Sequence, residues 1–330
     1  MKRRFDAEWG SPWGAVCHGM RLFTALPISE VKNALAIYVT GDTHGSQRYG
    51  SFSVDGFMHR LGTEVFPEQK EMCKDDHVII CGDFGGVWET DRKCVRESAS
   101  EKYSLDWLED KPFTTLFVPG NHENYDRLTG CRDERLLGCW LYAKMPPEEK
   151  DKLRAGYPRK RWHGGWVREL RPSVMMLERG EIFDIGGKSC FAFGGARSHD
   201  IRDGIVDPAD YPDERRFKKD YAVRRKGMIR VKRISWWEDE MPSQEEMDHG
   251  RKNIRAFMDS HEQLDFVITH DAPVSDKLLL GFDGTDELSD YLESLRGEMK
   301  YGKWFYGHLH DNRTLFGNHC LLYEQIVRID

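Results

Sequence analysis

The stretch Thr115-Leu116-Phe117-Val118-Pro119-Gly120-Asn121-His122-Glu123 places a run of polar side chains directly after a short apolar segment. Apolar runs of about 4–6 residues, rich in Val, Ile, Phe and Tyr and bounded by Gly or a polar residue, are typical of buried β-strands. The same arrangement recurs along the chain. The sequence predicts strands at 35–40, 77–81, 115–119, 264–269 and 303–306. The polar clusters that follow the other four are Asp42-Thr43-His44, Gly82-Asp83, His270 and Gly307-His308-Leu309-His310.

These polar clusters offer ligands for metal ions. If the strands lie in a sheet, their carboxyl ends meet at one edge, where α/β proteins place functional sites. Carboxylate oxygens, one amide oxygen and several imidazole nitrogens suit Mn, Fe, Zn or Co better than Mg or Ca, and none of the polar clusters contains a Cys that would indicate structural zinc. The residues that offer them are Asp42, Asp83, Asn121, His44, His270, His308 and His310. Together they predict two divalent ions, which can hydrolyse a phosphate ester without a covalent intermediate.

The prediction depends on the complete set. An isolated Gly-Asp is more often a turn, and a lone His270 is more often a structural histidine. Asn, His and Glu after a strand also begin helices. Only the ordered combination favours a metal site over these structural interpretations.

In this order, Asp-x-His, Gly-Asp, Gly-Asn-His-Glu, a lone His and Gly-His-x-His resemble the calcineurin-like metallophosphoesterase superfamily, over about residues 35–327. The resemblance implies an α/β fold, a two-sheet β-sandwich flanked by helices. It also implies the roles of the site residues. One metal is expected on Asp42, His44, Asp83 and His310, and the other on Asp83, Asn121, His270 and His308, so that Asp83 forms the bridge.

By the same resemblance, the protein is expected to be a phosphoesterase that depends on two metal ions, of which Mn is expected first and Fe, Zn or Co remain open. A hydroxide between the metals would attack a phosphate monoester or diester. His122, which is not a ligand in such enzymes, would protonate the leaving oxygen or stabilise charge on the phosphoryl group.

One difference from the phosphoprotein phosphatases of this superfamily narrows the range of expected substrates. Phosphoprotein phosphatases continue their second motif as Asp-x-Val-Asp-Arg-Gly, whereas here Asp83 is followed by Phe84-Gly85-Gly86-Val87-Trp88. Specific protein-phosphatase activity is therefore not expected. The alternative from another class is a non-catalytic, metal-binding interaction platform on the same fold. Such a protein would be expected to have lost ligands, and none is lost here.

The domain prediction is an extension at 1–33 followed by a single domain at 34–330. The extension is flexible, docks through Trp9, Trp13 and Phe23, or reflects a wrongly assigned start; the sequence leaves these three interpretations open. Insertions are predicted near 131–160 and 196–242.

Two motifs at the ends of the second insertion resemble a subgroup of bacterial metallophosphoesterases without settled roles, Gly194–Asp200 and Ile234–Ser243. Arg197 and Arg202 are predicted to grip phosphate oxygens, and His163 to approach from another loop. Basic residues between 215 and 233 indicate a solvated face or a site for a phosphate-rich substrate, such as a nucleotide or single-stranded nucleic acid stacked on Trp236 and Trp237.

Composition limits the partners. A formal net charge of −7 argues against stable nucleic-acid binding and leaves a phosphate ester, with nucleotides among the candidates, as the expected partner. Eight cysteines without a C-x-x-C spacing favour a cytoplasmic location. No apolar run approaches the roughly 18 residues of a membrane span. The oligomeric state is not indicated.

Further elements follow from local patterns. Ser243 and Glu246 form a capping box for a helix that runs to His261, and a second helix follows Thr285. Val174–Leu177, Ile182–Ile185 and Ser189–Phe193 are predicted as consecutive antiparallel strands that begin the second sheet. Their turns are expected at Arg179-Gly180 and Gly186-Gly187.

Overall fold

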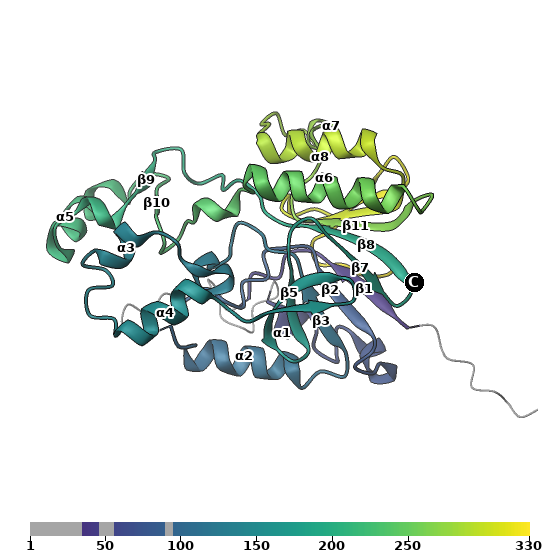
Figure 1. Cartoon of the computed structure of the whole chain (residues 1–330), viewed down its shortest axis with the longest axis horizontal. Helices are drawn as coiled ribbons and strands as arrows, with labels where there is room; N and C mark the ends of the chain where they lie inside the picture. The colour runs from purple at the N-terminus through teal and green to yellow at the C-terminus, as the bar shows by residue number, and fades with distance from the viewer. Residues whose placement is uncertain (1–34, 46–55, 90–94) are drawn as a thin grey trace, which may run out of the picture. The chain divides into compact units, whose positions relative to one another are not determined.

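The computed structural model describes residues 35–45, 56–89 and 95–330. The predicted extension 1–33 lies outside the described residues, whereas Ala34–Asp330 form one compact unit. Two β-sheets pack face to face in this unit, and helices cover their outer faces (Figure 1). The two-sheet sandwich flanked by helices is therefore confirmed.

The first sheet has seven strands in the order β15-β1-β2-β3-β6-β5-β4. Its strands are β1 (Ile37–Thr40), β2 (His77–Ile80), β3 (Thr114–Phe117), β4 (Arg159–Trp162), β5 (Gly165–Arg171), β6 (Val174–Leu177) and β15 (Ile326–Arg328). The parallel strands β1, β2 and β3 end in register, with Thr40 beside Ile80 and Ile80 beside Phe117. The polar residues that follow these three strands therefore leave the sheet at one edge.

The second sheet has six strands in the order β13-β14-β12-β11-β8-β7. Its strands are β7 (Glu181–Ile185), β8 (Lys188–Phe193), β11 (Leu264–Thr269), β12 (Tyr301–Tyr306), β13 (Arg313–Leu315) and β14 (His319–Leu321). Thr269 at the end of β11 pairs with Phe193 at the end of β8, and β12 runs parallel to both strands. His270 and Gly307 thus leave this sheet from its carboxyl edge as well.

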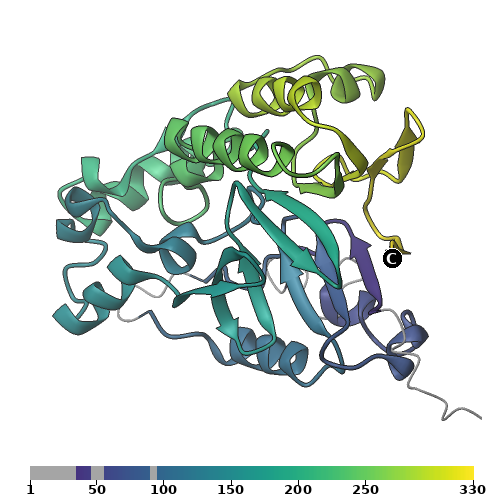
Figure 2. The same cartoon turned by 45° about the vertical axis from the view of Figure 1, so that its right-hand side comes forward.

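Apolar side chains fill the space between the sheets and the space beneath the helices. Ile79 of β2 and Ile268 of β11 belong to the same fully buried cluster between the sheets. On the outer face of the first sheet, α1 (Phe57–Arg60) and α2 (Ala99–Glu109) pack over a second cluster. On the outer face of the second sheet, α6 (Gln244–Met258) and α8 (Glu287–Glu298) pack over a third, and α7 (Val274–Leu279) contacts α8 (Figure 2).

The predicted capping box at the start of α6 is present, because Ser243 and Glu246 accept hydrogen bonds from each other's backbone N–H groups. The helix predicted after Thr285 is α8. Its N-cap is Asp286, whose side chain accepts from the backbone N–H groups of Leu288 and Ser289. Both helices lead into strands of the second sheet, as the pattern indicates.

The prediction that 174–193 forms three consecutive antiparallel strands is wrong in one part. β7 and β8 do form a hairpin, but β6 belongs to the first sheet, where it pairs in parallel with β3. All four residues of β6 are buried, as expected for a strand covered on both faces. Arg179-Gly180 is therefore the crossing from one sheet to the other and not a hairpin turn.

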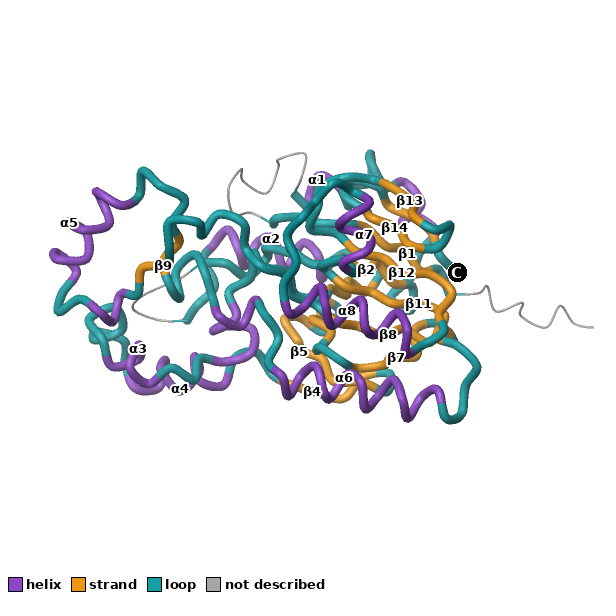
Figure 3. Tube along the Cα trace, turned by 90° about the horizontal axis from the view of Figure 1, so that it is seen from above, coloured by secondary structure: helices purple, strands orange, loops and turns teal. Residues whose placement is uncertain are grey.

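The two segments predicted as insertions lie largely beside the sheets (Figure 3). They contain α3 (Glu134–Gly138), α4 (Pro147–Ala155), β9 (Ile205–Val206), α5 (Glu214–Arg224) and β10 (Arg230–Val231). Single helical turns lie at Pro67–Glu71, Asp126–Gly130, Pro208–Asp210 and Glu238–Glu240. Among the described residues, no helix combines the length and the apolar character that a membrane span requires.

Part of the basic run between 215 and 233 is structural. Arg233 is buried and its Nη1 lies 2.7 Å from Asp126 Oδ1. Trp237 is also buried, and its indole N–H donates to Asp126 Oδ2 at 3.1 Å. A buried Trp237 offers no face to a nucleic-acid base, so the stacking predicted for this residue is wrong.

Candidate metal centre

The first group of predicted ligands converges at the carboxyl edge of the sheets. One donor atom from each of four residues lies within 4.8 Å of the donor atoms of the others; the residues are Asp42, His44, Asp83 and His310. His310 Nε2 is 3.1 Å from Asp42 Oδ2 and 3.1 Å from His44 Nε2. His44 Nδ1 is 3.8 Å from Asp83 Oδ2.

The second group lies on the other side of Asp83. His270 Nε2 is 3.2 Å from Asp83 Oδ1 and 3.3 Å from Asn121 Oδ1. The His308 ring lies 5.0 Å from the His270 ring, measured between centroids. Asp83 thus directs one carboxylate oxygen at each group, and the structure brings all seven predicted ligands together.

The donor set of the second group fits a cation. The Nδ1–H of His270 donates to the carbonyl of Cys81 at 2.7 Å, which leaves the lone pair of Nε2 on the side of Asp83 and Asn121. Such a backbone bond commonly orients a metal-binding imidazole. His308 Nε2 is buried without a hydrogen-bond partner among the described residues. Lone pairs that face one another in a buried site require a proton or a cation between them.

The electrostatics support the same interpretation. Burial raises the pKa of Asp83, but the imidazoles of His270, His122 and His44 outweigh this and hold it well below its usual range. Burial lowers the pKa of His270, but the charges of Asp83 and Asp42 raise it to about 10. The carboxylates therefore favour a positive charge at Nε2, which in the protein alone is the second proton of the His270 imidazolium. A bound cation would replace that proton, as metal binding to imidazole requires.

Four of the ligand residues have backbone conformations that are unusual for side chains with a Cβ. His44, Asp83, His308 and His310 have φ values of 46°, 44°, 67° and 49°. Left-handed conformations of this kind cost free energy and cluster at functional sites. Their presence at four of the seven predicted ligands is therefore consistent with a functional site at this edge.

Glycines in the motifs leave room for the ligands. At Gly307, a Cβ would lie 2.0 Å from Asp42 Oδ1, and at Gly120 it would lie 2.1 Å from Asp83 Oδ1. Neither distance is compatible with any side chain. Gly120 and Gly307 are thus required by the close approach of a carboxylate.

Replacing Gly120 by Ala is expected to weaken metal binding by at least about 10-fold, because the new methyl group would displace Asp83 and also lie 2.8 Å from His270 Nε2. Titration of the metal-free variant with Mn²⁺ measures the effect. Gly297→Ala is the matched control, since a Cβ there has no neighbour within 4 Å. Wild-type affinity in Gly120→Ala would contradict the packing described here.

His122 lies next to the first group. Its backbone N–H donates to Asp83 Oδ1 at 2.8 Å, and its ring centroid is 5.3 Å from that of His44. Glu123, the last residue of the same motif, has a structural role that the sequence did not reveal: its buried Oε1 accepts from the backbone N–H of Phe84 at 2.7 Å. Glu123 therefore ties two ligand-bearing loops together.

The loop Gly194–Asp200 reaches the centre. Ser198 Oγ accepts from Asn121 Nδ2 at 3.4 Å, and the His199 ring stacks on His308 with centroids 4.6 Å apart. Neither residue was predicted as part of the site. Arg197, between buried Ala196 and Ser198, has an exposed side chain, and so does Arg202 farther along the chain.

The structure does not bring His163 to the centre. His163 lies in the turn between β4 and β5, where its backbone oxygen and its Nδ1 both bond to the backbone of Asp184 in β7. Its ring is 6.3 Å from His77, the first residue of β2, whereas Asp83 follows the other end of that strand. The prediction that His163 approaches the substrate is therefore wrong.

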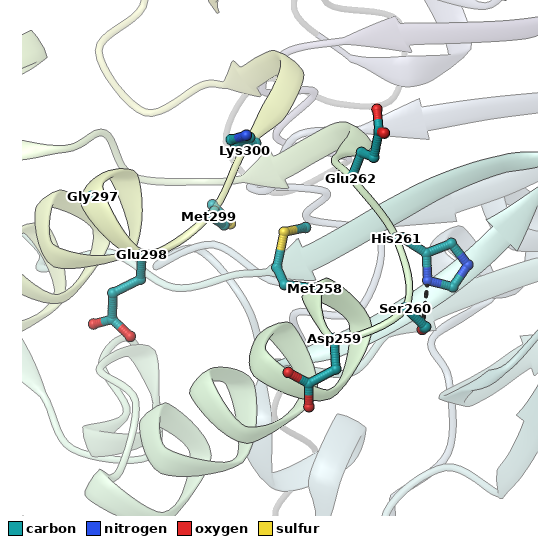
Figure 4. A pocket seen from close by; sticks show the side chains of 9 residues that line it. All are labelled: Met258, Asp259, Ser260, His261, Glu262, Gly297, Glu298, Met299 and Lys300. Carbon is teal, nitrogen blue, oxygen red and sulfur yellow. Dashed lines mark hydrogen bonds between the residues drawn. The ribbon is translucent and has the colours of Figure 1, made fainter.

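A hollow of about 630 Å³ lies away from this centre (Figure 4). It is formed where α6 leads into β11 and α8 leads into β12, at the ends of these strands opposite to His270 and Gly307. Its lining residues are Met258, Asp259, Ser260, His261, Glu262, Gly297, Glu298, Met299 and Lys300. None belongs to the predicted site.

Comparison with known proteins agrees with the geometry. The family model of calcineurin-like phosphoesterases matches residues 35–312, a range that contains all seven predicted ligands and His122. A search of the curated proteins found no match. The length of the family match shows that the chain belongs to the calcineurin-like phosphoesterases, a family of metal-dependent phosphoric ester hydrolases.

Proposed function

We propose that this protein hydrolyses phosphate esters with the help of two divalent metal ions. Both ions are expected to be Mn²⁺ in the native protein. The observation that carries the proposal is the position of Asp83. Its Oδ2 lies 3.8 Å from His44 Nδ1 and its Oδ1 lies 3.2 Å from His270 Nε2. One carboxylate therefore joins two groups of metal-type donors, as a bridging ligand does.

The residues divide into two ligand sets. One cation would be held by Asp42, His44, Asp83 and His310, and the other by Asp83, Asn121, His270 and His308. When bound, the two cations supply the positive charge that attracts a phosphate ester and the acidity that activates water for in-line attack. The buried carboxylates and imidazoles hold this charge in place before the substrate arrives.

His122 is the proposed catalytic residue. Its backbone N–H donates to Asp83, and its ring centroid lies 5.3 Å from that of His44 and 5.9 Å from that of Trp88. Beside the ligands but outside both sets, an imidazole can donate a proton to the leaving oxygen or a hydrogen bond to the phosphoryl group.

The substrate is proposed at the level of its chemistry. Both monoesters and diesters fit the ligand sets, and nucleotides are candidates because several cations on α5, such as Arg215 and Lys219, are exposed. Arg197 is the proposed phosphate-binding residue on the loop that carries Ser198 and His199. A cytoplasmic location is proposed from the cysteines, since the six described ones are free thiols.

Replacing His122 by Ala is expected to lower kcat about 10²- to 10⁴-fold without changing the metal content. The variant is assayed on a p-nitrophenyl ester and on an alkyl ester. If His122 protonates the leaving oxygen, the loss will be larger for the alkyl ester, because alkoxide leaves less readily. His59→Ala, an exposed histidine of α1, is the matched control. Unchanged kcat on both esters would contradict the catalytic role.

Hydrolysis of a chromogenic phosphate monoester and a chromogenic diester, measured in parallel with added Mn²⁺ and with a chelator, tests the activity itself. We expect turnover of at least one ester that the chelator abolishes. If the protein binds Mn²⁺ and hydrolyses neither ester, the alternative of a non-catalytic interaction platform on this fold is favoured.

A further inference from the structure

Two motifs that the ligand sets leave unexplained meet behind the metal centre. Ser198, from the loop after β8, donates its backbone N–H to Glu240 Oε1 and its hydroxyl to Glu240 Oε2, both at 2.8 Å. The indole N–H of Trp236 donates to Glu240 Oε1 at 2.9 Å. Ser198 and Glu240 are 4% and 1% exposed, so these bonds form away from solvent.

This arrangement decides what Ser198 offers to Asn121. A serine hydroxyl has one hydrogen, and a carboxylate only accepts, so the hydrogen of Ser198 Oγ is used in the bond to Glu240. Toward Asn121, the oxygen can only accept. The group of Asn121 that faces it must be the NH₂, at 3.4 Å, and Oδ1 then faces His270 Nε2 at 3.3 Å.

The protonation of Glu240 bears on this direction. Burial raises the pKa of Glu240 to about 7, against the hydrogen bonds from Ser198 and Trp236 that lower it. A pH of 8, above this value, favours the ionised side chain, which accepts all three bonds. Experiments on this network belong at that pH.

We propose that Ser198, held by Glu240 and Trp236, is a positioning residue that keeps the Oδ1 atom of Asn121 directed at the metal position formed by Asp83, Asn121, His270 and His308. The inference rests on the proposed function, because it needs a cation at that position. An amide nitrogen is not a metal ligand. Without Ser198 the amide is free to turn, and the position loses one oxygen for part of the time.

The effect is confined to one of the two metal positions. The loop of Ser198 also stacks His199 on His308, with ring planes 19° apart, so it contacts two ligands of this position. No contact found in the described part of the chain joins Ser198 or His199 to the three ligands that belong to the other position alone; these are Asp42, His44 and His310. Loss of Ser198 should therefore weaken metal binding at this position and leave the affinity of the other position unchanged.

The test measures Mn²⁺ binding to the metal-free protein at pH 8 by calorimetry. Metal analysis gives the number of ions bound per chain. In Ser198→Ala we expect one Kd to rise about 10- to 100-fold, because loss of a hydrogen bond that orients a metal ligand typically weakens metal affinity by this factor. The other Kd should stay unchanged. Ser198→Thr keeps the hydroxyl, so both Kd values should stay near those of the wild type. Ser189→Ala is the matched control, because Ser189 at the start of β8 bonds through its N–H and hydroxyl to a carboxylate, Asp265, far from the centre.

A double-mutant cycle separates orientation from packing. In Asn121→Asp both terminal atoms of the side chain are oxygens, so a rotation of the carboxylate still directs an oxygen at the metal position. Ser198→Ala should then have little further effect on Kd. A full 10-fold loss in this background would overturn the proposed role. Trp236→Phe, which removes one support of Glu240, gives a second variant if Ser198→Ala does not fold, and we expect the same selective rise in one Kd.

The outcomes distinguish this inference from the proposed function. If the wild-type protein binds two Mn²⁺ ions and Ser198→Ala binds both with unchanged affinity, the positioning role is overturned and the proposed function stands. If the wild-type protein does not bind two ions, the proposed function fails and the positioning role fails with it.

Discussion

Replacing Asp83 by Asn should lower kcat/KM for phosphate esters by more than about 10³-fold, because loss of the paired metal charge removes about 4 kcal/mol or more of transition-state stabilisation. The two oxygens of Asp83 face different ligand groups, Oδ2 toward His44 and Oδ1 toward His270 Nε2. Asn retains an oxygen for one group and presents an NH₂ to the other. We therefore expect the bound Mn²⁺ to fall below two ions per chain together with the activity.

Metal analysis and steady-state kinetics on the same preparation check this result. Asp184→Asn is the control, since Asp184 of β7 is exposed and its carboxylate accepts a local backbone hydrogen bond from Gly187. If Asp83→Asn retains two Mn²⁺ ions and wild-type turnover, Asp83 is not the bridge.

Replacing Arg179 by Met is expected to lower the free energy of unfolding by about 3–5 kcal/mol, because several buried groups would lose their hydrogen-bond donor at once. Arg179 is 7% exposed. Its Nε donates to the carbonyl of Gly194 at 2.9 Å, and its Nη2 donates to the Tyr125 hydroxyl at 3.0 Å and to the carbonyl of Asp239 at 2.7 Å. The guanidinium thus holds together three loops around the metal centre.

Urea unfolding of the metal-free protein measures this loss without the contribution of bound metal. Arg159→Met serves as the control, since Arg159 is exposed and pairs with Glu178 at the surface. We expect little change in the control. An unfolding midpoint in Arg179→Met equal to that of the wild type would show that the loops do not depend on this side chain.

The convergence of the predicted ligands could be read from the sequence because each polar cluster directly follows a strand. Strand and ligand are specified by neighbouring residues, as in the run that ends at Gly120 and continues with Asn121. The parallel register of β1, β2 and β3 then brings the ligands to one edge whatever their separation along the chain. His270 could be predicted only as a member of this set, since a single histidine after a strand has no specific meaning.

Features that depend on contacts between distant segments could not be read in the same way. The residues Val174–Leu177 fit a buried strand in either sheet, and pairing with β3 decides between them. His163 is kept from the centre by its bonds to Asp184. The partner of Ser198 is Glu240, 42 residues away, and neither side chain suggests the other in the sequence.

The basic run shows the same limit. Arg233 and Arg230 belong to a stretch whose charge predicts a solvated or anion-binding surface, yet both side chains are buried. Their carboxylate partners, Asp126 and Asp200, come from other parts of the chain. Charge alone therefore did not distinguish structural arginines from exposed ones such as Arg215.

The most direct test of the account is an anomalous-scattering map from a crystal of the protein grown with Mn²⁺. The account predicts two peaks about 3.5–4 Å apart. Each should lie about 2.0–2.2 Å from a different oxygen of Asp83, with His310 beside one peak and His270 beside the other. A single peak, or two peaks that do not share Asp83, would contradict the dinuclear centre proposed here.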